Sequence, residues 1–127
     1  MNFWTKISEK LSVWDVDVLI EIGWSHKIPP SMLSIPRVAT VGIHNSLLPA
    51  YQGAASLNWA LINDFSSWGC TLFHLEEDID AGEIIYHEGF EITDIDDINT
   101  LFLKSDRLSV EMLNRFLPLA SKNLAPR

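Results

Sequence analysis

The chain has 127 residues, 47% of them hydrophobic, and this length suits a single domain with one core. Nine Lys and Arg against 17 Asp and Glu give a net charge of −8, which repels a polyanion, so nucleic acid is not favoured as a partner. No apolar run approaches the roughly 20 residues of a membrane helix, and the N-terminus lacks the apolar segment of a signal peptide, so the composition predicts a cytoplasmic protein.

The first part of the chain predicts one helix and two short strands. Apolar residues recur at helical spacing from Phe3 onward, which indicates an amphipathic helix over about residues 2–13. The runs VDVLIEI (16–22) and RVATVGI (37–43) are rich in β-branched residues and have the pattern of buried strands. Between them the Pro29-Pro30 pair excludes a long helix but allows one short turn.

The middle of the chain predicts a helix followed by a β-hairpin. Residues 54–63 contain no proline or glycine and place leucines at helical spacing. Residues 68–78 and 83–92 alternate as strands do, and the turn around Asp80 and Gly82 joins them. These two strands are therefore predicted to pair with each other.

The last helix is predicted from an apolar stripe that runs from Ile98 to Phe116 and ends at Pro118, with Asp94 and Asp96 as candidate caps. The order helix, strand, strand, helix, two strands, helix predicts an α/β three-layer sandwich, as one domain over residues 1–127. The Gly-rich first turn of a nucleotide-binding sheet is missing upstream, so we expect a fold that lacks its first βα units.

Two residues are candidates for acid/base chemistry. His44 follows a predicted strand, and Asp80 follows another, so both are expected at an edge of the sheet where α/β proteins gather ligands. A carboxylate beside an imidazole would hold its tautomer and stabilise its charged form. From position alone, a histidine such as His44 is more often a structural group than a catalytic one, and an aspartate such as Asp80 is more often a turn former. Cys70 is predicted to be a small core residue.

The acidic segment between the third and fourth predicted strands has two interpretations. It could bind a metal ion, or it could be a solvated turn, and its spacing differs from that of a calcium loop, which favours the solvated turn. The residues concerned are His74, Glu76, Glu77, Asp78, Asp80 and Glu83.

The segments GIHNSLLPAYQGAASLNWALIN (42–63) and GCTLFHLEEDIDAGEII (69–85) resemble the 10-formyltetrahydrofolate-dependent formyltransferases, a family with a Rossmann-like fold. The resemblance implies that His44 and Asp80 are the catalytic pair and that Thr71 lines the same site. It also implies that 10-formyltetrahydrofolate is the formyl donor and that a primary amine accepts the formyl group, possible acceptors including an amino sugar nucleotide.

The same resemblance implies a folate pocket. The segment GWSHKIP resembles one wall of the pterin pocket, and the turn from Glu76 to Asp80 resembles the opposite wall. The residues expected to contact the folate are Gly23, Trp24, Ser25, Ile28, Glu77 and Asp78.

Two departures from the family pattern lead to an alternative. The family has asparagine two residues before the histidine, as a donor to the formyl oxygen, and this chain has Gly42 there, with Asn45 expected to point elsewhere. The strands and helices that precede this region in the family are missing, so we expect a partner or a second copy to cover the exposed sheet edge. The alternative is a degenerate member that binds folate or acts as a protein-interaction module.

Overall fold

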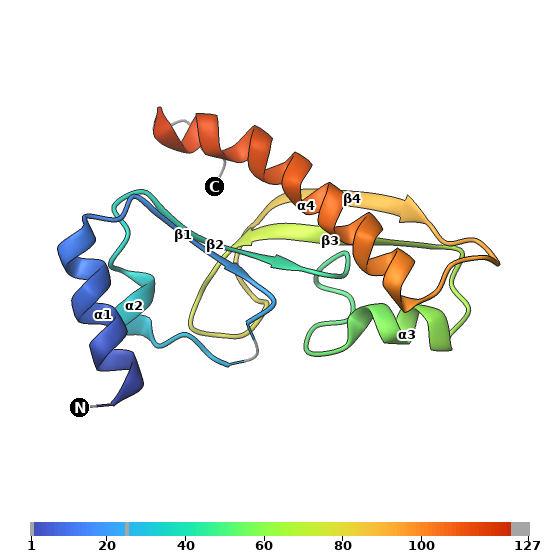
Figure 1. Ribbon diagram of the computed structural model, residues 1–127, viewed down its shortest axis with the longest axis horizontal. Helices are drawn as coiled ribbons and strands as arrows, with labels where there is room; N and C mark the ends of the chain where they lie inside the picture. The colour runs from blue at the N-terminus through green and yellow to red at the C-terminus, as the bar shows by residue number, and fades with distance from the viewer. Residues whose placement is uncertain (1, 25, 123–127) are drawn as a thin grey trace.

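The computed structural model describes residues 2–24 and 26–122. Its elements alternate between helices and strands in the predicted order (Figure 1). They are α1 (Phe3–Trp14), β1 (Val18–Ile22), α2 (Pro30–Leu33), β2 (Ala39–His44), α3 (Ser56–Ile62), β3 (Ser67–His74), β4 (Ile84–Glu91) and α4 (Ile98–Ser121). The predicted α/β class and the hairpin followed by a helix are confirmed.

The four strands form one mixed sheet in the order β1-β2-β3-β4. Strands β1 and β2 run parallel, whereas β2 with β3 and β3 with β4 run antiparallel. In this register Val41 lies opposite Ile20 on one side and His74 on the other. The parallel pair comes first in the chain and the antiparallel hairpin second, as the sequence predicts.

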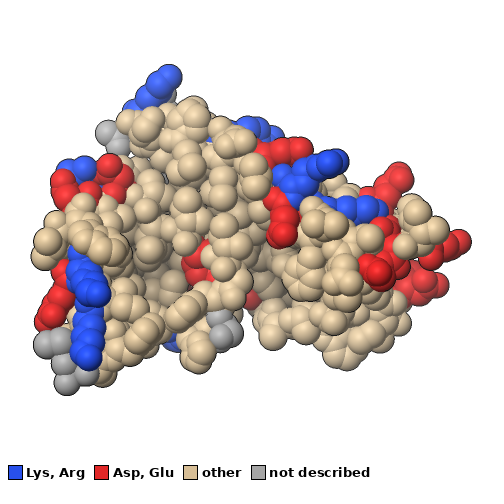
Figure 2. Space-filling model, viewed as in Figure 1, with Lys and Arg blue, Asp and Glu red and all other residues tan. Residues whose placement is uncertain are grey.

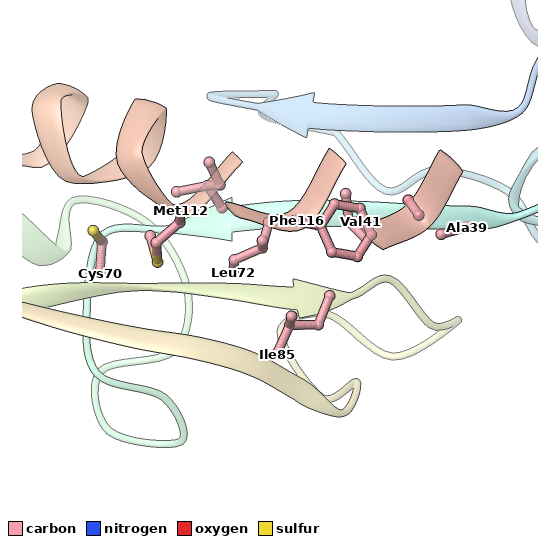
Figure 3. Close-up of a cluster of buried hydrophobic side chains, with 9 residues drawn as sticks. Ala39, Val41, Cys70, Leu72, Ile85, Met112 and Phe116 are labelled. Atoms are coloured by element: carbon pink, nitrogen blue, oxygen red, sulfur yellow. The ribbon is translucent and has the colours of Figure 1, made fainter. Parts of the chain in front are cut away.

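The main hydrophobic core lies between the sheet and α4. In Figure 3 Met112 and Phe116 extend from α4 toward Val41 on β2 and Leu72 on β3. All four side chains are fully buried. Because side chains alternate along a strand, the residues between these core positions face the opposite side of the sheet.

The opposite face of the sheet is covered by α2 and by the loop that follows β2. The Thr40 hydroxyl on β2 donates to the carbonyl of Leu33 in α2 at 2.8 Å. The Leu48 N–H in the following loop donates to the Thr71 hydroxyl on β3 at 3.0 Å. The domain therefore has three layers, as predicted, with α4 on one side of the sheet and these segments on the other.

The start of α4 differs from the prediction. Asp97 is the cap: its side chain accepts from the Thr100 N–H, and the Thr100 hydroxyl accepts from the Asp97 N–H, both at 2.9 Å. Asp96 accepts from the Thr93 N–H and from Lys104 instead. The prediction of Asp94 or Asp96 was wrong because capping requires the carboxylate one residue before the helix to reach back over its first turn.

The end of α4 also differs, since the helix continues through Pro118 to Ser121. A proline removes one backbone hydrogen bond and crowds the carbonyl four residues earlier. Only one short turn of helix follows Pro118, so a break at the proline would affect only that turn. Packing of Ala120 in the core, where it is 1% exposed, opposes fraying of the turn.

The surface carries no large basic region on the face seen in Figure 2. Acidic and basic side chains lie toward the margins of that face, and most of its centre is uncharged. Among the residues that the structure describes, no helix is both long enough and apolar enough to span a bilayer.

Candidate functional site

His44 and Asp80 lie side by side, although they are far apart in the chain. His44 is the last residue of β2, and Asp80 lies in the loop between β3 and β4. The His44 Nδ1 atom is 3.5 Å from the Asp80 Oδ2 atom, and each side chain is 13% exposed. The two groups can therefore form an ion pair when the imidazole is protonated, in a partly dehydrated place where their attraction is strengthened.

The second ring nitrogen of His44 fixes its tautomer. Nε2 is 2.8 Å from the carbonyl oxygen of Tyr51. A carbonyl can accept but cannot donate, so Nε2 carries the hydrogen in this contact. In the neutral ring, Nδ1 then has the free lone pair, and that lone pair faces Asp80. Nδ1 is consequently the atom that can take up a proton.

Asp80 is held in place by the loop that follows β2. Its Oδ2 atom accepts from the Gly53 N–H at 2.9 Å, and its carbonyl accepts from the Gln52 side chain at 3.0 Å. Gly82, two residues later, lies so close to β3 that a Cβ there would be 1.6 Å from the His74 carbonyl oxygen. The glycine is thus required for the turn that brings Asp80 to His44.

Thr71 lies beside His44 in the sheet but uses its hydroxyl within the protein. The two residues are paired in register across β2 and β3. The Thr71 hydroxyl donates to the Ser46 carbonyl at 2.7 Å and accepts from the Leu48 N–H at 3.0 Å, and the side chain is fully buried. Thr71 therefore anchors the loop that carries Tyr51 and Gly53.

Two cavities meet at this site. The smaller, of about 120 Å³, is lined by Trp24, Ile28, Leu75 and the turn that contains Glu77 and Asp78. Four of the predicted folate contacts, Trp24, Ile28, Glu77 and Asp78, therefore lie around one hollow. Ser25, a fifth, lies outside the described residues.

The larger cavity, of about 540 Å³, contains the histidine and the sixth predicted contact. It is lined by His44, Gly23 and the start of α3, and Asp106 of α4 also contributes. Four residues line both cavities and so form the wall between them: Glu21, Trp24, Ile79 and Asp80. A group bound in one cavity could therefore reach a group bound in the other across this wall.

Trp24 is supported by α1, a connection that the sequence did not suggest. The Phe3 ring stacks on Trp24 with centroids 6.3 Å apart and planes inclined by 7°. The Trp4 ring meets it edge-on at 6.0 Å. Such aromatic contacts fix ring orientation and add stability beyond area burial. The N-terminal helix thus helps to shape the wall of the smaller cavity.

Glu21 is the site residue that sequence reasoning missed. Its Oε1 atom accepts from the Trp24 N–H at 2.5 Å, and burial raises the pKa of its carboxyl group. A Cβ added to Gly42 would be 3.2 Å from Glu21 Oε2 and 2.8 Å from Leu75 Cδ2, so these side chains occupy the space beside Gly42. The available signal was a lone carboxylate in the otherwise apolar strand VLIEI.

Asn45 lines the larger cavity, but its side chain is turned toward α4. Its Oδ1 atom accepts from the Ser105 hydroxyl of α4 at 2.5 Å. Its carbonyl accepts from the Trp68 indole and from the Ser56 hydroxyl. The hydrogen bond from Ser105 thus holds the Asn45 side-chain oxygen on the α4 side of the sheet.

The chain is similar in sequence to known formyltransferases. The family model described as formyl transferase matches residues 2–117. The methionyl-tRNA formyltransferase of Pelotomaculum thermopropionicum is 34% identical over 97% of this chain, which spans 38% of that protein.

Solved structures agree with the sequence match. The phosphoribosylglycinamide formyltransferase from Bacillus halodurans superposes with a TM-score of 0.74 at 28% identity, covering 91% of this chain and 58% of that one. HypX from Aquifex aeolicus shares the fold, with a TM-score of 0.82 at 21% identity over 96% of this chain and 21% of its own. The chain thus spans well under two thirds of each of these proteins. On the family match, the shared fold and the paired His44 and Asp80, the chain belongs to the formyl transferase family.

Proposed function

We propose that this chain carries the formyl-transfer centre of an enzyme that moves a formyl group from 10-formyltetrahydrofolate to a primary amine. The observation that carries the proposal is the His44–Asp80 pair, with 3.5 Å between Nδ1 and Oδ2. Asp80 lies on the wall shared by the two cavities, and His44 lines the larger one. One cavity would hold the donor and the other the acceptor. The match to formyltransferases over residues 2–117 supports the same reaction class.

The smaller cavity has the chemistry of a pterin site. Trp24, Ile28 and Leu75 offer apolar surface to a flat ring, while Glu77 and Asp78 offer acceptors to its N–H groups. Its volume of about 120 Å³ is below the roughly 300 Å³ of a typical ligand site, so the ring edge would enter and the rest of the donor would extend over the shared wall. When bound, the donor supplies a formyl group attached to nitrogen.

The larger cavity suits a cationic amine. Three acidic side chains line it, those of Asp80, Asp106 and Glu21, and its described lining includes no lysine or arginine. An ammonium group would be attracted there, whereas a phosphate group would be repelled. If the acceptor is an amino sugar nucleotide, its amino group would enter this cavity and its phosphates would lie outside it.

His44 and Asp80 would carry out the proton transfers that accompany formyl transfer. A bond forms between the amine nitrogen and the formyl carbon, and the bond from that carbon to the donor nitrogen breaks. Once an ammonium acceptor has released a proton to water, one proton must leave the neutral amine, and one must reach the donor nitrogen. The His44 Nδ1 lone pair can take up the first directly or through water and return it to the second, while Asp80 stabilises the imidazolium in between. Thr71 would act indirectly, by anchoring the loop whose Tyr51 carbonyl fixes the ring.

Donor binding is tested first, without turnover. A stable folate analogue should raise the melting temperature, since a ligand that binds the native state at 100 times its Kd stabilises it by about 2.7 kcal/mol. Trp24→Ala should remove most of this shift, and Trp59→Ala, which removes a 49% exposed tryptophan of α3, is the matched control. If a saturating concentration of the analogue leaves the melting temperature unchanged, the proposed binding of the folate donor is wrong.

The chemistry is tested with His44→Ala and Asp80→Asn. Each should lower the rate of formyl transfer by about 100-fold to 10,000-fold while the variant remains folded, because positioned proton transfer contributes that much. His87→Ala and Asp94→Asn change exposed residues of the same types and serve as controls. Wild-type rates in either site variant would remove the residue from its role.

The alternative, a folate-binding module without transferase activity, is favoured by the missing side chain at Gly42. It predicts analogue binding with no formyl transfer to any amine. The partner expected at the sheet edge also stays a prediction: within the described residues β1 pairs with β2 and with no other strand. A strand from another chain or segment could add to that edge.

A further inference from the structure

The space beside Gly42 contains a carboxyl group. Gly42 lies on the cleft side of β2, two residues before His44 and opposite Glu21 in the parallel pair. A Cβ on Gly42 would come within 3.2 Å of Glu21 Oε2. The other carboxyl oxygen, Oε1, accepts from the Trp24 N–H at 2.5 Å. Glu21 is therefore oriented by one oxygen and directs the other toward the point that a side chain at position 42 would reach.

Formyl transfer requires a hydrogen-bond donor that His44 cannot readily supply. Attack on a formyl carbon places negative charge on the formyl oxygen, and preorganised donors stabilise that charge. Both nitrogens of His44 face acceptors, Nε2 the Tyr51 carbonyl and Nδ1 the Asp80 carboxylate. The Asn45 side chain is turned toward Ser105 on the α4 side. Glu21, on the wall between both cavities, is the remaining polar side chain of β1 and β2 directed at this place.

Resting on the proposed function, we propose that the Glu21 carboxyl group, in its protonated form, donates through Oε2 to the formyl oxygen and replaces the side chain that Gly42 lacks. In this form Oε1 is the carbonyl oxygen that accepts from Trp24, and Oε2 carries the proton. A neutral carboxylic acid in a partly apolar site is an established kind of oxyanion donor. Glu21 would thus be a catalytic residue of the reaction.

The surroundings of Glu21 shift its pKa in the direction that the protonated form requires. Burial raises its pKa, and the negative charge of Asp80 raises it further; the Trp24 N–H and His44 act in the opposite direction without cancelling the rise. Asp80 itself accepts from the Gly53 N–H at 2.9 Å. The other charged or titratable groups that line the adjoining cavities are His26, Lys27, Glu76, Glu77, Asp78 and Asp106.

The test compares Glu21→Ala with Glu21→Gln in two measurements. The first is the ratio of the Kd values for a folate analogue with and without a formyl group on the same nitrogen. The wild type should prefer the formylated analogue by up to about tenfold, the value of one hydrogen bond. Glu21→Ala should lose this preference, and Glu21→Gln, whose amide is a permanent donor, should keep it.

The second measurement is kcat for formyl transfer against pH. Glu21→Ala should lower kcat by about 100-fold or more, the usual cost of one oxyanion donor. In the wild type the protonated donor is present at low pH and is lost as pH rises through the Glu21 pKa, so kcat should decline as pH rises through that pKa. The decline should be absent in Glu21→Gln, whose amide does not titrate. Glu111→Ala, at an exposed position of α4, controls for loss of a carboxylate elsewhere.

A reciprocal variant tests the spatial argument. Glu21→Ala combined with Gly42→Asn removes the contact with Glu21 and supplies an amide there. The contact with Leu75 remains, but Cδ2 is the end of a side chain that can turn into the space left by Glu21, so the pair should recover much of the activity that Glu21→Ala loses. Gly42→Asn alone should be poorly tolerated, because its Cβ would meet Leu75 at 2.8 Å and Glu21 at 3.2 Å.

The outcomes separate this inference from the proposed function. Analogue binding with the same formyl preference in wild type and Glu21→Ala overturns the role of Glu21 and leaves the proposed function standing. A Glu21→Gln variant as defective as Glu21→Ala also overturns it, since the carboxylate would then act as an acceptor. Failure of the wild type to bind either analogue overturns both proposals.

Discussion

The two faces of strands β2 and β3 differ in what they contact. On one face Val41, Cys70 and Leu72 are fully buried against α4. On the other face Gly42, His44 and Thr71 meet loops and cavities. The same backbone thus presents a solid apolar core on one side and a polar site on the other, with neighbouring residues serving different purposes.

The difference lies in what holds each face together. The α4 side depends on shape and apolar contact, which tolerate no loss of volume. The cleft side depends on a few directed hydrogen bonds, such as that from Gly53 to Asp80 and those at the Thr71 hydroxyl. Substitutions on the α4 side should therefore change stability first, whereas substitutions on the cleft side should change ligand binding and chemistry first.

The largest expected effect on stability is that of Phe116→Ala. Phe116 is fully buried on α4 between the helix and the sheet, and truncation of a buried phenylalanine costs about 3–5 kcal/mol through lost burial and the cavity left behind. Urea unfolding measures the loss. Where the variant is still folded, its affinity for a folate analogue should match the wild type, because no described residue of α4 lines the smaller cavity.

The matched control for Phe116→Ala is Leu103→Ala on the same helix. Leu103 is 69% exposed, so its truncation should change the free energy of unfolding by less than about 0.5 kcal/mol. Equal destabilisation by the two variants would contradict the assignment of the core to one face of α4. A large loss of analogue affinity in folded Phe116→Ala would contradict the independence of the two faces.

The elements of the fold could be predicted because their signals are local. The run RVATVGI indicates a buried strand by its composition, and the apolar stripe of α4 indicates a helix by its period, whatever surrounds them. The choice of Asp97 over Asp96 as the cap could not be made, because both carboxylates precede the helix and the backbone geometry decides between them.

The site could be predicted in part. His44 and Asp80 were identified through a resemblance to a family, since neither residue has a distinctive local pattern. Glu21 was missed because its place in the site depends on the pairing of β1 with β2. The Glu21 carboxyl group lies beside Gly42, which has no side chain to fill that space. Thr71 was expected at the site for the same reason as His44, and its two loop contacts are visible only in three dimensions.

A smaller loss of stability, with a larger effect on function, is expected for Thr71→Val. The substitution keeps the shape but leaves the Ser46 carbonyl and the Leu48 N–H without their partner, at a cost of about 1–3 kcal/mol. The loop would shift and release the Tyr51 carbonyl from His44, so formyl transfer should fall further than in Phe116→Ala. Thr71→Ser retains the hydroxyl and should behave nearly as the wild type. Wild-type transfer by Thr71→Val would show that the loop is held by other contacts.

The smallest effect concerns Cys70, the neighbour of Thr71 in sequence, which faces α4. Its thiol is fully buried, and burial raises its pKa from 9.0 to about 11. The unfolded chain therefore loses this proton near pH 9 while the folded chain keeps it, so stability is full below pH 9 and is lost as pH rises toward 11. Between pH 9 and pH 10 the loss should be about 1 kcal/mol. Urea unfolding of the wild type and of Cys70→Ala at both pH values isolates this contribution, because the variant keeps every other titrating group. An equally steep decline in Cys70→Ala, or rapid alkylation of the thiol in the folded wild type, would mean that the α4 face is open to solvent and that the two faces of the sheet differ less than the structure indicates.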